Sequence, residues 1–185
     1  MGSLKALKKE LVHTRSIRMQ TFAVDEERVV VEGVLEDIRP FGVHTISNQR
    51  RESGQVHGMT VRLLIGGMPS RIQDAEAEMK KVPLDGCGQA VDSVKKLVGM
   101  PIVYGFSKEV KERLSGIEGC NHLTSLILTM GSAAVQGMAA HRGRKPVPPE
   151  ARAAMLEYLK DTCCVWREDG DLFREVSDQI KNEQG

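Results

Sequence analysis

The sequence predicts an α+β protein: an antiparallel sheet of two hairpins covered on one face by helices. Two observations predict this class. In the first half, hydrophobic and polar residues alternate over several segments, as they do in strands that bury one face. From residue 87 onward, hydrophobic residues recur every three or four positions, as they do in amphipathic helices. Strands that precede the helices, rather than alternating with them, indicate helices packed on an antiparallel sheet.

Four strands are predicted in the first half of the chain. They pair as two hairpins, with the ranges 14–22 and 27–41, then 56–66 and 70–79. In the third strand His57 shares a face with the apolar residues Met59 and Val61, so its imidazole should point into the protein. The polar, aperiodic segment 42–55 between the hairpins is predicted to be a loop.

The second half is predicted to be mainly helical. The predicted helices span 87–98, 107–116, 120–141 and 149–160. Two short apolar runs flank Asp169-Gly170, which predicts a β-hairpin over 163–176. We therefore divide the chain into a main α+β domain, 1–145, and a C-terminal helix–hairpin extension, 146–185, packed on the same domain.

Charge and composition argue against several kinds of partner. The chain of 185 residues has a net charge of only +1 at pH 7, which gives no electrostatic basis for binding nucleic acid or a membrane surface. It has no run of about 18 apolar residues, and its first residues do not have the pattern of a signal peptide, so we expect no membrane span and a cytoplasmic location. The phosphate-binding motifs of nucleotide cofactor sites are absent. The sequence is compatible with a small-molecule ligand and with a homo-oligomer.

A cysteine and a histidine lie two positions apart in the segment Gly119-Cys120-Asn121-His122-Leu123. Cys120 is predicted at the start of the longest helix, where a thiolate is favoured by free backbone amides and the positive helix end. Residues two apart diverge on a regular helix, but a residue at the cap is not yet helical, so both side chains can reach one point.

Two further residues point toward the same core. Cys87 begins a predicted helix between two glycines, and His57 lies on the inward face of its strand. Two cysteines and two histidines are a suitable ligand set for Zn²⁺ or iron. The predicted metal ligands are therefore His57, Cys87, Cys120 and His122.

Other functions fit the same residues. Cys120 could be the nucleophile of a thiol enzyme with His122 or His57 as its base. The cysteines and histidines could instead be core residues of a non-catalytic module that binds a small ligand, because free cysteine is often buried as a small hydrophobe. His13 and Arg15, just before and within the first strand, could bind an anion or simply occupy an exposed strand end.

The order of several segments resembles a bacterial family of unknown function. The segments are HTRSIRM, VVVEGVLEDIRP, VHGMTVRL, IQDAEAEMKKVPLDGC, KLVGMPIVYGFSKEVKERLSGIEGCNHLTSLI and CCVWREDGDLFRE, and Gly-Cys-x-His-Leu is the family hallmark. The resemblance implies a small bacterial cytoplasmic protein and names no reaction. In that family an acidic residue often follows the histidine corresponding to His57, where this chain has Gly58.

The layout is also similar to that of the Nif/Isc U-type iron–sulfur scaffold proteins, which hold metal with cysteines at helix starts and at a strand. The similarity implies that His57 replaces the first cysteine and that Cys87 and Cys120 match the other two. A histidine in that position favours a mononuclear metal over ordinary cluster assembly.

Overall fold

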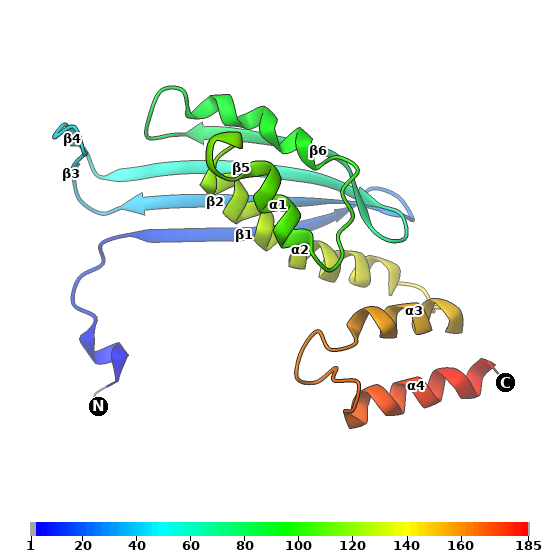
Figure 1. Cartoon of the computed structure of the whole chain (residues 1–185). Coiled ribbons are helices and arrows are strands. Elements are labelled where there is room, and N and C mark those ends of the chain that lie inside the picture. Colours follow the sequence, from blue (N-terminus) through cyan, green and yellow to red (C-terminus); the bar gives the residue numbers. More distant parts are fainter. Residues whose placement is uncertain (1–2, 185) are drawn as a thin grey trace. The chain divides into compact units, whose positions relative to one another are not determined.

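The computed structural model describes residues 3–184, and the chain forms two compact units, Met1–His141 and Arg142–Gly185 (Figure 1). The first unit contains an antiparallel sheet and the longest helix, so the predicted α+β class is confirmed. The division between the units falls at residues 141 and 142, whereas the sequence placed it at 145 and 146.

Four long strands form the sheet of the first unit. They are β1 (Thr14–Ala23), β2 (Arg28–Arg39), β5 (Gly54–Gly66) and β6 (Arg71–Lys81), in the spatial order β1-β2-β5-β6. All neighbours are antiparallel, which confirms both predicted hairpins. The predicted loop between them contains two short strands, β3 (Val43–His44) and β4 (Arg50–Arg51), which pair with each other.

The two faces of the sheet have opposite chemistry. On the inner face, β2 and β5 present a row of fully or almost fully buried side chains: Val29, Val31, Leu35, Met59, Val61, Leu63 and Ile65. On the outer face, Arg62 forms ion pairs with Glu32, Glu76 and Glu78 across three strands. The alternation in the sequence therefore assigns one face to the core and the other to solvent.

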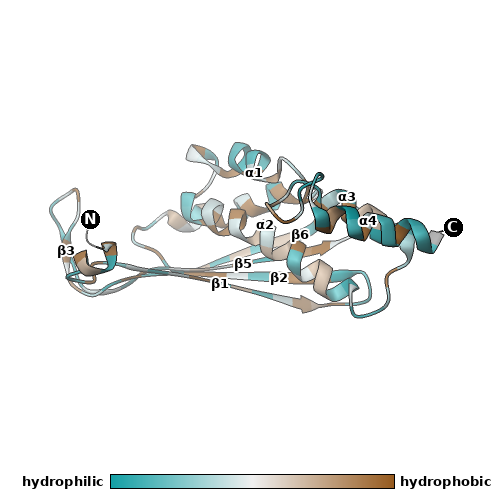
Figure 2. Ribbon diagram, turned by 90° about the horizontal axis from the view of Figure 1, so that it is seen from below, coloured by the Kyte–Doolittle hydropathy of each residue, from teal (hydrophilic) through white to brown (hydrophobic). Residues whose placement is uncertain are grey.

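Helices of the first unit cover only the inner face, as Figure 2 shows for α1 and α2. The elements that follow the sheet are the 3₁₀ helix η2 (Cys87–Leu97), α1 (Phe106–Leu114), the short 3₁₀ turn η3 (Gly116–Glu118) and α2 (Asn121–Arg142). A 3₁₀ turn, η1 (Leu4–Leu7), precedes the sheet. The segment that starts at Cys87 is thus helical as predicted, but of the tighter 3₁₀ type.

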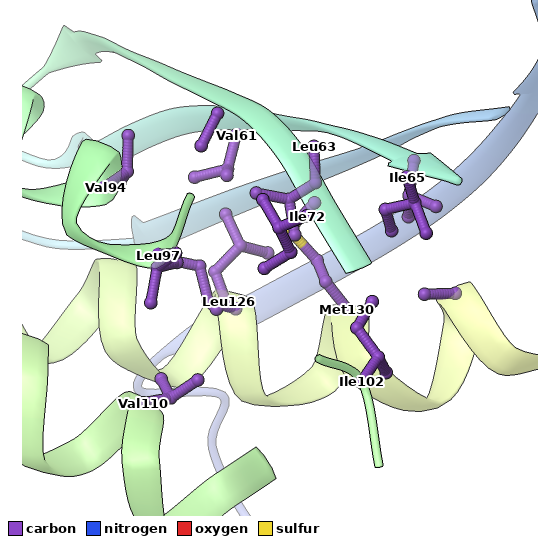
Figure 3. Close-up of a cluster of buried hydrophobic side chains, with 14 of the residues drawn as sticks. Val61, Leu63, Ile65, Ile72, Val94, Leu97, Ile102, Val110, Leu126 and Met130 are labelled. Atoms are coloured by element: carbon purple, nitrogen blue, oxygen red, sulfur yellow. The ribbon is translucent and has the colours of Figure 1, made fainter. Parts of the chain in front are cut away.

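The core lies between α2 and the inner face of the sheet (Figure 3). Leu126 and Met130 of α2 meet Val61, Leu63 and Ile72 there, and all five are fully buried. By length and composition alone α2 is apolar enough to cross a membrane. Eight of its residues are nevertheless buried within the protein, which is the pattern of a core helix.

Two glycines allow elements to approach α2 closely. A Cβ atom at Gly131 would lie 2.6 Å from Cε1 of Phe106, at the start of α1. A Cβ atom at Gly33 of β2 would lie 2.9 Å from the sulfur of Met130. Both distances are shorter than van der Waals contact, so these positions set how closely α2 packs on the sheet and on α1.

The second unit consists of α3 (Pro149–Leu159) and α4 (Asp171–Gln184). The β-hairpin predicted over 163–176 is therefore wrong. Leu172, Val176 and Ile180 recur at helical spacing, and Gly170 precedes the first turn of a helix instead of forming a strand turn. Cys163 and Cys164 lie in the connecting turns, where both are exposed.

Candidate functional site

A buried carboxylate lies at the centre of the candidate site. Asp37 follows Leu35 on the inner face of β2 and is only 2% exposed. Arg15 lies opposite it on β1 and donates from Nε to Oδ1 and from Nη2 to Oδ2, both at 2.7 Å. His13 Nε2 lies 3.2 Å from Oδ1. The anion that His13 and Arg15 bind is thus a side chain of the same protein.

The charge on Asp37 is strongly stabilised. Hydrogen bonds from Arg15, together with a smaller contribution from His57, lower the pKa of Asp37 to about 2 although burial acts in the opposite direction. Asp37 is therefore ionised at neutral pH, as a metal ligand or hydrogen-bond acceptor must be.

His57 contacts the same carboxylate from the other side. It pairs with Asp37 in the β2–β5 register, and its Nδ1 lies 2.8 Å from Oδ2. Its side chain is 13% exposed, so it points inward as predicted. Gly58 pairs with Glu36 and therefore faces the outer side of the sheet, so an acidic residue there would not reach the imidazole. Asp37 supplies the acidic partner instead.

His122 completes the cluster from the first turn of α2. Its Nε2 lies 4.0 Å from Oδ2 of Asp37, and its ring stacks on that of His57 with the centroids 3.8 Å apart and the planes tilted by 31°. Burial lowers the pKa of His122, and the nearby His57 and Arg15 lower it further. His122 is therefore a neutral imidazole at pH 7, the form that binds metals.

Local backbone contacts hold the start of α2 in place. Thr124 Oγ1 lies 3.0 Å from the carbonyl oxygens of both Leu114 and Cys120 and donates its hydroxyl there. A Cβ atom at Gly119 would lie 2.6 Å from the oxygen of Leu114, so only glycine fits between the end of α1 and the start of α2. The Gly-Cys-x-His-Leu segment thus has a structural reason for its glycine.

Cys120 lies beside His122 but on the other edge of its ring. Its Sγ is 3.8 Å from Nδ1, whereas Nε2 is the nitrogen nearer Asp37. The two residues predicted as catalytic, Cys120 and His122, are therefore in contact. In this arrangement the thiol can orient the imidazole through Nδ1 while Nε2 stays free to bind a ligand.

Potential ligand atoms of Asp37, His57 and His122 all lie within 4.8 Å of one another. Of the four ligands predicted from sequence, the structure brings His57 and His122 together and adds Asp37. Cys120 is adjacent through His122, and Cys87 at the start of η2 lies outside this group. Asp37 had a signal in the sequence, because it is the one acidic residue in the inward row of β2.

These residues come from three separate elements, and each lies close to one end of its element. Asp37 lies near the end of β2, His57 near the start of β5 and His122 at the start of α2. The end of β2 and the start of β5 lie at the left of the sheet in Figure 1. No curated protein and no solved structure matches the chain, so the similarity to Nif/Isc U-type scaffolds stays a prediction.

A family model matches residues 13–136, about two thirds of the chain. The match begins at His13 and includes Asp37, His57 and His122. Its description is "Protein of unknown function (DUF2889)", which agrees with the predicted family of unknown function. The chain belongs to the DUF2889 family of proteins of unknown function.

Proposed function

We propose that the protein binds one divalent transition metal, Zn²⁺ or Fe²⁺, through His57 Nδ1, His122 Nε2 and Asp37 Oδ2. The supporting observation is that one potential ligand atom from each of these three residues lies within 4.8 Å of the other two. Two histidines and one carboxylate are the ligands of many mononuclear iron sites, and the same donor set also binds catalytic zinc. A bound ion requires donors about 2.0–2.2 Å from it, so binding calls for a small inward movement of His122.

Arg15 is compatible with this ligand set. Its two hydrogen bonds use one lone pair on each oxygen of Asp37, and each carboxylate oxygen has two. Ligating carboxylates are commonly held by such outer hydrogen bonds. A metal ion between His57 Nδ1 and Asp37 Oδ2, which lie 2.8 Å apart, would replace the hydrogen bond between them.

Three protein ligands leave at least one coordination position for water or substrate. Sites of this kind are typical of catalytic metals, whereas structural zinc sites are closed by four protein ligands. The His122 side chain is 31% exposed, so the cluster is open to solvent on that side. We infer metal-assisted hydrolysis as the reaction class, because a bound Zn²⁺ lowers the pKa of its water to about 7.

Titration of the metal-free protein with Co²⁺ tests this proposal. We expect one ion per chain with a d–d absorption spectrum, and loss of that spectrum in His57→Gln and in His122→Gln. His44→Gln is the matched control, because His44 is exposed in β3. An unchanged affinity in both site variants would exclude the proposed ligands. A thiolate-to-cobalt charge-transfer band lost in Cys120→Ser would instead make Cys120 a ligand.

A second function is favoured by one contact, the 3.8 Å between Cys120 Sγ and His122 Nδ1. We propose it as a thiol enzyme in which His122 takes the proton of Cys120. The rate of alkylation of Cys120, measured against pH in the Cys87→Ser, Cys163→Ser, Cys164→Ser background, decides it. We expect the alkylation to be slower in His122→Gln, because the base that takes the thiol proton is lost. An equal rate in both proteins at every pH would exclude this function.

A further inference from the structure

Positive charge exceeds negative charge on the inner face around Asp37. Arg15 already neutralises Asp37 with two hydrogen bonds. Arg39, the last residue of β2, lies two positions after Asp37 and therefore on the same face. His13 is also at this end of the sheet, since the pairing of Thr14 with Ile38, continued by one residue, sets it opposite Arg39.

Arg39 has an enclosed donor without an acceptor. Its Nε is buried from solvent and has no hydrogen-bond partner among residues 3–184, although the residue as a whole is only half-buried. An N–H group that is buried without an acceptor loses its water and gains no bond in exchange. The nearest acid on the strand, Asp37, is already occupied by Arg15, and the neighbouring Glu36 faces the other side of the sheet and accepts from Gln55.

We infer that Arg39 binds a small oxyanion, a carboxylate or phosphate group, and that this group belongs to the substrate of the Asp37 site. A planar guanidinium matches the two oxygens of either group. The side chain of His13 is 45% exposed, but its Nε2 already lies 3.2 Å from Oδ1 of Asp37, so the oxyanion site rests on Arg39. An anion also suits a metal on the adjacent cluster, because the ion adds two positive charges where Arg15 and Arg39 already outnumber Asp37.

The assignment of this oxyanion to a substrate rests on the proposed metal function, whereas the anion site itself rests on Arg39. The two can be tested separately by NMR of the arginine Nε–Hε groups. The full-length protein is titrated with inorganic phosphate and, in a separate arm, with acetate, first without metal and then loaded with Zn²⁺. Preference for one anion identifies the substrate group as a phosphate or a carboxylate.

We expect either anion to shift the Arg39 Nε–Hε resonance, and Zn²⁺ to tighten the binding. Arg39→Gln should weaken the binding by about tenfold or more, as loss of a charge-assisted hydrogen bond does. Arg39→Lys keeps the charge but removes Nε, and it should weaken the binding while preserving the fold. Arg18→Gln is the control, because Arg18 is exposed on the outer face of β1 and its loss should change nothing.

Two results separate the inference from the proposed function. Anion binding that depends on Arg39 in a protein that binds no Zn²⁺ would support the oxyanion site and overturn the metal function. An Arg39 resonance that does not move with either anion, or equal affinity in wild type and Arg39→Lys, would overturn the oxyanion site whatever the metal does.

Discussion

At the scale of single residues, Asp37 is the group on which the site depends. It is 2% exposed, accepts two hydrogen bonds from Arg15 and contacts His57. A buried carboxylate loses its hydration, so it is retained only where fixed donors replace water. Arg15 and His57 provide those donors here, and the register of β1, β2 and β5 places all three side by side.

We expect Asp37→Asn to destabilise the protein. The NH2 group of the asparagine side chain would face N–H groups of Arg15 and His57, which need an acceptor. Breaking a fully buried pair costs about 3–5 kcal/mol. The Arg15 side chain is 37% exposed, so a loss of about 2 kcal/mol in the free energy of unfolding is expected. Urea denaturation measures it. Asp169→Asn is the control, because Asp169 makes a similar two-point pair with Arg167 that is exposed, so this substitution should cost much less than Asp37→Asn.

The same carboxylate makes stability depend on pH. The pKa of Asp37 is lowered to about 2 in the folded protein, against about 3.9 in the unfolded chain. A lowered folded pKa contributes stability above the unfolded value, and this contribution is lost as pH falls from about 4 toward 2. We expect the stability difference between wild type and Asp37→Asn to shrink by roughly 2 kcal/mol from pH 5 to pH 2. A constant difference would contradict the assigned pKa.

At the scale of elements, the start of α2 positions His122. The hydroxyl of Thr124 donates to the carbonyl oxygens of Leu114, at the end of α1, and of Cys120. Gly119 has no side chain, so the carbonyl oxygen of Leu114 can lie close to it. The direction of the His122 side chain therefore depends on a backbone contact between two helices. This contact is the structural reason for the glycine of the Gly-Cys-x-His-Leu segment.

Gly119→Ala should disturb this junction. The new Cβ atom would lie 2.6 Å from a backbone oxygen, which cannot move without moving α1. We expect a loss of about 1–3 kcal/mol in unfolding free energy and weaker Co²⁺ binding. Gly88→Ala in η2 is the matched control, since no atom lies within 4 Å of its added Cβ and its stability should change by less than about 1 kcal/mol. Equal behaviour of the two variants would show that the junction does not need a glycine.

The sequence patterns predicted most of the elements of the first unit, because alternation and helical spacing are local signals. Asp37 was missed as a site residue although it stands in the inward row of β2, since its partner Arg15 becomes visible only when the strands are in register. The C-terminal hairpin was mispredicted because Asp169-Gly170 is compatible with either a strand turn or the start of a helix. Cys87 shares the helix-start position of Cys120, but position along the chain does not determine whether two helix starts meet.

At the scale of the whole molecule, every residue of the cluster lies in the first unit, and the family match ends at residue 136 within it. Metal binding should therefore not depend on the second unit. We expect Ser177→Pro, inside α4, to disrupt that helix at a cost of about 3 kcal/mol. The Co²⁺ affinity should stay within about twofold of wild type, with Ser177→Ala as the control that keeps the helix. A tenfold loss of affinity in Ser177→Pro alone would place part of the site outside the first unit.

Crystals of the full-length protein grown with one equivalent of Zn²⁺, measured at the zinc absorption edge, test the central claim most directly. We expect one anomalous peak about 2.0–2.2 Å from His57 Nδ1, His122 Nε2 and Asp37 Oδ2, with Arg15 still bonded to the carboxylate. A peak on Cys163 and Cys164, or no peak between the three ligands in a fully loaded sample, would contradict the metal site.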